Sequence, residues 1–148
     1  MFPNAKPSEL TAVLAVMNPK SVSASTVVSD YVPVANFHTL RALLLTGVLG
    51  ASATVDAKLV QATDASGTGS KDITGKAITQ LVKASNDNNQ AVINVRGEDL
   101  DATNGFTHVA LSVTVGTAAS IVAATLEGYS SRYAPASASN AATVVQVV

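Results

Sequence analysis

The sequence contains no cysteine, and this absence excludes disulfide bonds, thiolate zinc sites and cysteine nucleophiles together. Tryptophan is absent too. Three phenylalanines and three tyrosines are few for a glycan-binding module, which needs exposed aromatic side chains on its loops. The only histidines, His38 and His108, are too few for a histidine metal site without carboxylate help, and His108 falls on the polar face of a predicted strand. No apolar run is long enough to span a bilayer.

Charged side chains are scarce, at 13% of residues against a usual share of about 25%. Nine Lys and Arg against ten Asp and Glu give a net charge of -1, with no basic stripe that would attract nucleic acid. A nearly neutral surface suits a protein that packs against others, because few charges are desolvated on assembly. Composition alone fits an ordinary alanine-rich domain equally well. We expect neither nucleic acid nor a membrane as a partner.

The N-terminus, MFPNAKPSEL, carries prolines and an acidic residue where a signal peptide needs a basic region and an apolar run. We therefore expect synthesis in the host cytoplasm. The chain length of 148 residues fits one domain with a single core.

Motifs of catalysis and cofactor binding are weak. No Gly-x-Ser-x-Gly elbow accompanies the many serines, and residues 67–71 (GTGSK) lack the spacing of a phosphate-binding loop. Asp99, Asp101 and Asn104 faintly resemble a calcium loop, but they are out of register with an EF-hand and the closing Glu is missing. A solvated turn is the better interpretation. We expect no enzyme activity, no catalytic residue, no metal and no cofactor.

Short alternating segments separated by Gly, Asn and Asp turns predict an all-β fold, an antiparallel β-sandwich of jelly-roll-like form with extended N- and C-terminal arms. Residues 10–17 (LTAVLAVM) fit either a short helix or a buried strand. Residues 63–72 (TDASGTGSKD) form the longest polar loop, which we expect to be an exposed, flexible tip. Residues 21–30 fit a strand or an extended arm, and the other predicted strands lie in residues 36–46, 54–62 and 91–96, with a short one within 73–82.

The strongest pattern is the alternation in residues 107–115, where Val109, Leu111, Val113 and Val115 share one face. Gly116 and Thr117 break it, and an extended run over residues 119–127 follows until Gly128. The pattern predicts a β-hairpin that ends at Gly128.

We divide the chain into an N-terminal arm (1–20), a sandwich domain (21–135) and a C-terminal arm (136–148). The last arm ends in an uncharged valine-rich segment that would be a sticky strand if it were free. It either docks on the sheet edge of a neighbour, adds a final strand to its own sheet, or frays. Together with the Tyr and Arg side chains that precede it, it supplies the candidate partner-interface residues: Tyr129, Arg132, Tyr133, Val144, Val145, Val147 and Val148.

The order of these elements resembles that of small β-sandwich structural proteins of tailed bacteriophages and gene transfer particles. The phrases that carry the resemblance are NFHTLRALLLTG, TVDAKLVQATDASG, ITGKAITQL and LEGYSSRYAP, within residues 35–135. The loop over residues 63–72 departs from it, because the family often has an Asp-rich phrase there.

The resemblance implies a virion component, either a decoration protein on the capsid surface or a protein of the neck, tail or head spike. Low charge and uncharged arms favour a capsid decoration, or cement, protein that binds and stabilises the outer lattice. Its implied partners are the major capsid protein and further copies of itself in a homo-oligomer. The alternatives are a neck, tail or head-spike base component, or a receptor- or glycan-binding module of a spike.

Overall fold

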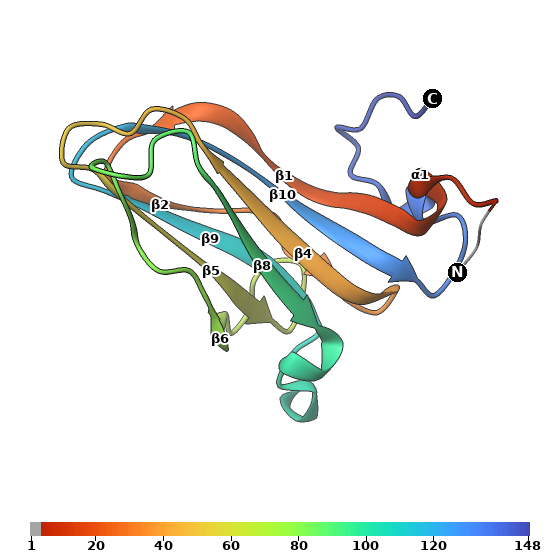
Figure 1. Ribbon diagram of the computed structural model, residues 1–148. Coiled ribbons are helices and arrows are strands. Elements are labelled where there is room, and N and C mark those ends of the chain that lie inside the picture. The colour runs from red at the N-terminus through yellow and green to blue at the C-terminus, as the bar shows by residue number, and fades with distance from the viewer. Residues whose placement is uncertain (1–3) are drawn as a thin grey trace.

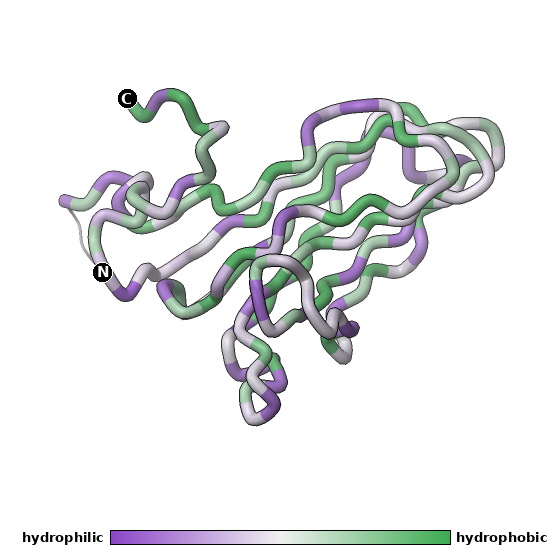
Figure 2. The backbone as a smooth tube through the Cα atoms, turned by 180° about the vertical axis from the view of Figure 1, so that it is seen from behind, coloured by the Kyte–Doolittle hydropathy of each residue, from purple (hydrophilic) through white to green (hydrophobic). Residues whose placement is uncertain are grey.

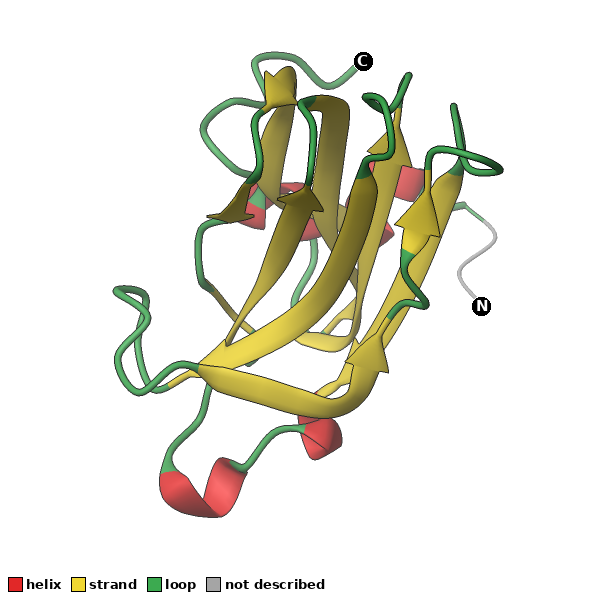
Figure 3. Ribbon diagram, turned by 90° about the vertical axis from the view of Figure 1, so that its left-hand side faces the viewer, coloured by secondary structure: helices red, strands yellow, loops and turns green. Residues whose placement is uncertain are grey.

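Two antiparallel β-sheets pack face to face in the computed structural model, which describes residues 4–148 (Figures 1 and 3). One sheet has the strand order β1-β10-β4-β8 and the other β2-β9-β5-β6, with two short strands, β3 and β7, added to β9 and β5. The strands are β1 Thr11–Val22, β2 Ser25–Val28, β3 Val32–Pro33, β4 Phe37–Thr46, β5 Thr54–Ala62, β6 Lys71–Ala77, β7 Leu81–Val82, β8 Gln90–Arg96, β9 His108–Gly116 and β10 Ser120–Ser131. Within residues 4–148 the helical turns are α1 Pro7–Leu10 and the 3-10 turns η1 Gly97–Asp99, η2 Ala102–Asn104 and η3 Ala136–Ser139.

The strand order is that of a jelly roll. When the eight longer strands are counted along the chain, one sheet reads first, eighth, third, sixth and the other second, seventh, fourth, fifth. This order confirms the prediction of an antiparallel sandwich of jelly-roll type.

The core lies between the two sheets and is made by the inward residues of each strand. In β9, Val109, Leu111, Val113 and Val115 are all buried, as the alternation predicts. Facing them from the other sheet are Leu40 and Leu44 of β4 and Leu126 of β10, all buried as well. Alternation fixes which face of each strand is apolar, and so it fixes the register of both sheets.

The predicted hairpin is wrong. β9 and β10 are consecutive in the chain, but β9 pairs with β2, β3 and β5 in one sheet, and β10 pairs with β1 and β4 in the other. Residues 117–119 therefore carry the chain from one sheet to the other. Periodicity reveals a strand and its buried face but not its neighbours, and a short connection fits both arrangements.

Gly128 does not end β10, which continues to Ser131. The glycine is buried, and a Cβ built on it would lie 2.6 Å from the ring of Phe37. It is needed here for the close approach of an aromatic ring and not for a turn.

The predicted N-terminal arm, residues 1–20, is wrong in its second half. Residues 11–20 belong to β1, which pairs along β10, so the helix-or-strand question over residues 10–17 is settled as a strand after Leu10. The first three residues of the predicted arm lie outside the described part. The sandwich therefore begins about ten residues earlier than the sequence pattern indicates.

The loop after β5 is exposed, as predicted, but its own contacts hold it. The Asp64 carboxylate accepts hydrogen bonds from the backbone N–H groups of Ser66 and Thr68 at 2.9 and 3.1 Å. The hydroxyl groups of Tyr31 and Ser70 hydrogen-bond at 2.6 Å. The prediction of a flexible tip missed the bond from Tyr31 to Ser70, because Tyr31 is remote in sequence.

Candidate interaction surface

The C-terminal segment folds back onto the edge of its own sandwich. η3 packs against β1 and α1, and Ala136 at its start is buried in the core. The Asn140 side-chain oxygen accepts a hydrogen bond from the Val13 N–H at 2.9 Å, and the Ala141 N–H donates to the Val13 carbonyl at 2.7 Å. Because β1 is an edge strand, these two bonds satisfy backbone groups that would otherwise meet only water.

Beyond Ala141 the chain turns away from β1. The Val144 N–H donates to the Ala141 carbonyl at 2.9 Å, and no strand is formed in residues 142–148, called the tail below. The tail rises from the end of the sandwich where α1 lies (Figure 1), and hydrophobic colour continues along it toward the C-terminus (Figure 2). Its four valines are interrupted only by Gln146. Val145 and Val148 are 92% and 97% exposed.

A charged cluster lies beside the tail, on the outer face of the sheet. Arg41 of β4 and Glu127 of β10 face each other in register, and the guanidinium lies 2.6 Å from the carboxylate. The Tyr129 hydroxyl donates to the same carboxylate at 2.5 Å, and Thr125 donates to it at 3.0 Å. The Arg41 guanidinium also lies over the Tyr129 ring, 5.0 Å from its centre.

Two pKa values in this cluster shift in opposite directions. Partial burial tends to raise the pKa of Glu127, but the hydrogen bonds from Tyr129, Arg41 and Thr125 outweigh it and hold the pKa below its usual value. Burial, followed by the bond to the ionised Glu127, raises the pKa of Tyr129 to about 12. Glu127 is therefore held as a carboxylate and Tyr129 as a neutral hydrogen-bond donor. Their hydrogen bond joins two side chains of β10 and stabilises the structure of this surface.

Only part of the predicted interface comes together. Tyr129, Val144 and Val147 line one open hollow of about 400 Å³, together with the charged cluster, Asn140 and residues of α1 and β1. Arg132 lies instead in a separate hollow with His38 and Arg96. The exposed side chains Tyr133, Val145 and Val148 are not among the residues that line either hollow.

Sequence patterns did not reveal Arg41 or Glu127 as part of this surface. The alternation of β4 and β10 indicates that both point away from the core. Their contact, however, depends on β4 and β10 being neighbours, and the predicted hairpin gave β10 a different partner.

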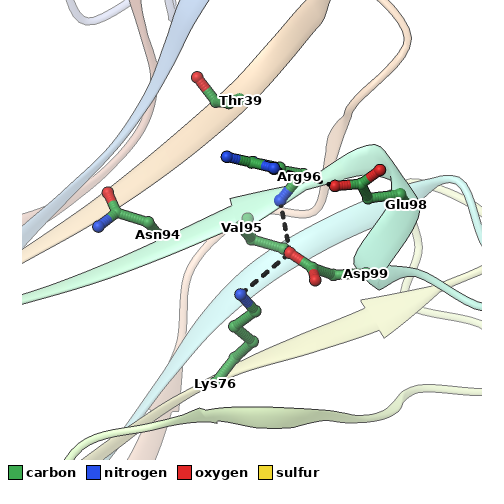
Figure 4. Close-up of a pocket in the computed structure, with 7 residues that line it drawn as sticks. All are labelled: Thr39, Lys76, Asn94, Val95, Arg96, Glu98 and Asp99. Carbon is green, nitrogen blue, oxygen red and sulfur yellow. Dashed lines mark hydrogen bonds and ion pairs between the residues drawn. The ribbon is translucent and has the colours of Figure 1, made fainter.

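A third hollow, of about 490 Å³, opens beside β8 (Figure 4). Its charged groups are engaged with one another. The Asp99 carboxylate accepts from the backbone N–H of Arg96 at 2.8 Å and pairs with Lys76 at 3.0 Å, and these contacts hold the pKa of Asp99 below its usual value. The Arg96 side chain pairs with Glu98 at 3.1 Å.

The aspartates of the weak calcium-like motif are paired in the same way. Asp101 accepts hydrogen bonds from Asn104 and pairs with Lys71 at 2.5 Å, while Asp99 is occupied by Lys76. Within residues 4–148 no three His, Cys, Asp or Glu side chains are grouped to hold a metal ion. No helix in that range is long and apolar enough to cross a membrane.

No protein-family model matches the sequence, and no curated protein matches it significantly. Solved structures give distant likenesses. The SPBc2 prophage-derived protein YomS aligns with a TM-score of 0.43 at 10% identity, covering 78% of this chain and 92% of that one. A chain of the cowpea mosaic virus top component aligns with a TM-score of 0.45 at 9% identity, covering 87% and 89%. A Bacillus endospore appendage protein aligns at 0.34 and 15%, covering 87% and 98%. Likenesses this weak carry no argument about function.

Proposed function

We propose that this chain is a non-enzymatic structural protein of a virus particle, a decoration protein that binds the outer capsid lattice and stabilises it. The observation that carries the proposal is the tail, an uncharged valine-rich segment that projects from a folded sandwich (Figure 1) and exposes Val145, Val147 and Val148. Exposed aliphatic side chains in such a number favour burial against a partner. The resemblance of residues 35–135 to phage structural proteins names the class of partner, the major capsid protein.

The proposed mechanism is mass action. A protein that binds only the assembled lattice stabilises that state by its free energy of binding. Each tail offers few side chains, so a single contact is weak, but repetition over many lattice sites makes modest contacts sufficient. The low content of charged residues helps, because few ions lose their water on docking.

The proposed interface includes the exposed residues of the tail, Val145, Val147 and Val148, together with Tyr133. Tyr129 and Val144 line the same hollow as Asn140, whose side chain accepts a hydrogen bond from Val13 and so anchors the start of the tail on β1. Arg132 lies on the neighbouring surface and is exposed. The anchor sets where the tail leaves the sandwich, so the direction of docking is fixed while the last residues adapt to the partner.

Copy number in purified particles tests the proposal. Quantitative mass spectrometry should find this chain in a fixed large ratio to the major capsid protein. A count near that of a portal or tail ring would point instead to a neck, tail or spike component. Absence from particles would overturn the virion role.

The role of the tail is tested by removing residues 142–148. The shortened protein should fold with a nearly unchanged melting temperature and lose at least tenfold in capsid occupancy, because all the removed residues except the half-buried Val144 are exposed in the free protein. The control replaces exposed Ser66 and Thr103, both remote from the tail in sequence, with Glu and should bind as the natural chain does. Full occupancy without the tail would show that another surface contacts the capsid.

A further inference from the structure

A second apolar surface lies on the sheet β1-β10-β4-β8, at the end remote from the tail. Leu45 of β4, Val48 just after it, Val92 of β8 and Ile121 of β10 are 38%, 55%, 51% and 47% exposed. They are neighbours by register: Leu43 pairs with Val92, and Leu45 pairs with Ala123, two residues from Ile121. We call Leu43, Leu45, Val48, Val92, Ile121 and Ala123 the aliphatic patch.

The backbone is shaped to present this patch. Gly47 donates its N–H to the Ile121 carbonyl, and a Cβ built on Gly47 would lie 3.0 Å from the Cβ of Ile121. The missing side chain leaves room for Ile121 to lie across the neighbouring strand. The patch is therefore continuous over three strands.

The outer face of the other sheet has a different character. There β5 and β9 present Asp56, Lys58 and Thr114, and Lys58 pairs with Asp72 of β6 at 2.9 Å. That face is suited to water. The two faces of one sandwich therefore differ, and only one carries a cluster of exposed aliphatic side chains.

The charge pattern favours a second copy of this chain as the partner that covers the aliphatic patch. In a two-fold contact the same patch lies on both partners, so a charged residue near the axis would face its own like charge. The outward residues of β4, β8 and β10 around the patch are uncharged: Leu43, Leu45, Gln90, Val92, Asn94, Ile121, Ala123 and Thr125. On β4, β8 and β10 the nearest outward charges, Arg41 and Glu127, neutralise each other. The exposed Lys20 of β1, in register with Val122, lies at the edge of the patch.

The area of the face is compatible with a weak dimer. Four strands about 4.8 Å apart, with up to about ten residues at about 3.3 Å each, set an upper limit of roughly 600 Å², and the tail lies beside the Arg41 end of this face. Two such faces would bury at most about 1,200 Å², which is the upper end of the range for weak, transient interfaces. We propose that two copies of this protein associate through this face, sheet against sheet with the aliphatic patches in contact, as a reversible dimer of micromolar or weaker affinity. This inference does not rest on the virion role, because the dimer forms in the isolated protein.

Sedimentation velocity of the full chain, from micromolar concentrations to about 1 mM, tests the proposal. The mean mass of the natural protein should rise from one chain toward two. Val92→Glu should weaken the association at least tenfold, because two carboxylates are brought together in an apolar contact. Val28→Glu is the matched control: Val28 is similarly exposed, at 44%, but lies in the other sheet, and its variant should associate normally.

Ile121→Ser is a milder second variant that should also weaken the dimer, and circular dichroism with thermal melting confirms that each variant is folded. A natural protein that stays monomeric up to about 1 mM overturns the proposal. So does an equal loss in Val28→Glu. If deleting residues 142–148 abolishes association while Val92→Glu does not, the tail and not this face joins the copies.

Discussion

At the scale of single residues, Gly128 is the clearest case of a side chain excluded by its surroundings. It lies within β10, opposite Leu40, and the ring of buried Phe37 occupies the space above it. Three atoms of that ring would lie within 2.7 Å of an added Cβ. Phe37 begins β4 and is 2% exposed, within a close-packed core, so the glycine is required by packing.

Replacing Gly128 with Ala should lower the free energy of unfolding by about 1–3 kcal/mol, because the added methyl group displaces the Phe37 ring from its place in the core. Gly97→Ala is the matched control, since a Cβ there meets no atom within 4 Å. Urea denaturation of both variants measures the difference. Equal stability of the two would mean that the core adapts around residue 128.

At the scale of elements, the sequence predicted strands better than it predicted their partners. The segment 54–62 was predicted with its observed bounds, and 36–46 and 91–96 within one residue of theirs, because each has its own alternation and its own turn residues. The pairing of β10 with β1 and β4 depends on residues more than 75 positions away, and no local pattern encodes it. Docking of Asn140 on Val13 was missed for the same reason.

The segment from η3 to Ala141 is held on β1 by Asn140, so Asn140→Ala should loosen it. The Val13 amide loses its acceptor, and we expect its hydrogen-exchange protection to fall sharply while global stability drops by about 1 kcal/mol. Asn36→Ala is the control, because Asn36 is exposed and lies at the start of β4. Unchanged exchange at Val13 would show that Ala141 and η3 hold the segment without the side chain.

At the scale of the whole molecule, acid should destabilise this sandwich. The pKa values of Asp99, Asp101 and Glu127 all lie below their ordinary values of 3.8 and 4.5, through hydrogen bonds and ion pairs present only in the folded state. Their contribution to stability is complete above the unfolded-state pKa values and is lost as the pH falls through the folded ones.

The urea midpoint should therefore stay nearly constant between pH 7 and pH 5 and fall below about pH 4.5. Glu127→Gln should lower stability at pH 7 and flatten part of the acid slope, because its amide does not titrate. Glu98→Gln, at an exposed surface pair, is the comparison. An unaltered slope in Glu127→Gln would assign the acid sensitivity to the aspartates.

The sequence predicted the fold class, an antiparallel β-sandwich, because Val, Leu and Ala side chains alternate with polar ones along each strand and so mark its buried face. It did not reach the charged cluster, the aliphatic patch or the true start of the sandwich. Arg41 and Leu45 have an interpretable surface role only once β4 is known to lie between β10 and β8. Such surfaces are properties of strand order, which becomes visible only in three dimensions.

The position of β10 has a consequence for the newly made chain. β10 lies between β1 and β4, yet it is synthesised after every other strand of the sandwich. Until it has emerged from the ribosome, β1 and β4 each present an unpaired edge, and the core lacks Val122, Ala124 and Leu126 of β10. The nascent chain is therefore most exposed to aggregation and proteolysis just before synthesis of the sandwich is finished, when binding by chaperones has the greatest effect.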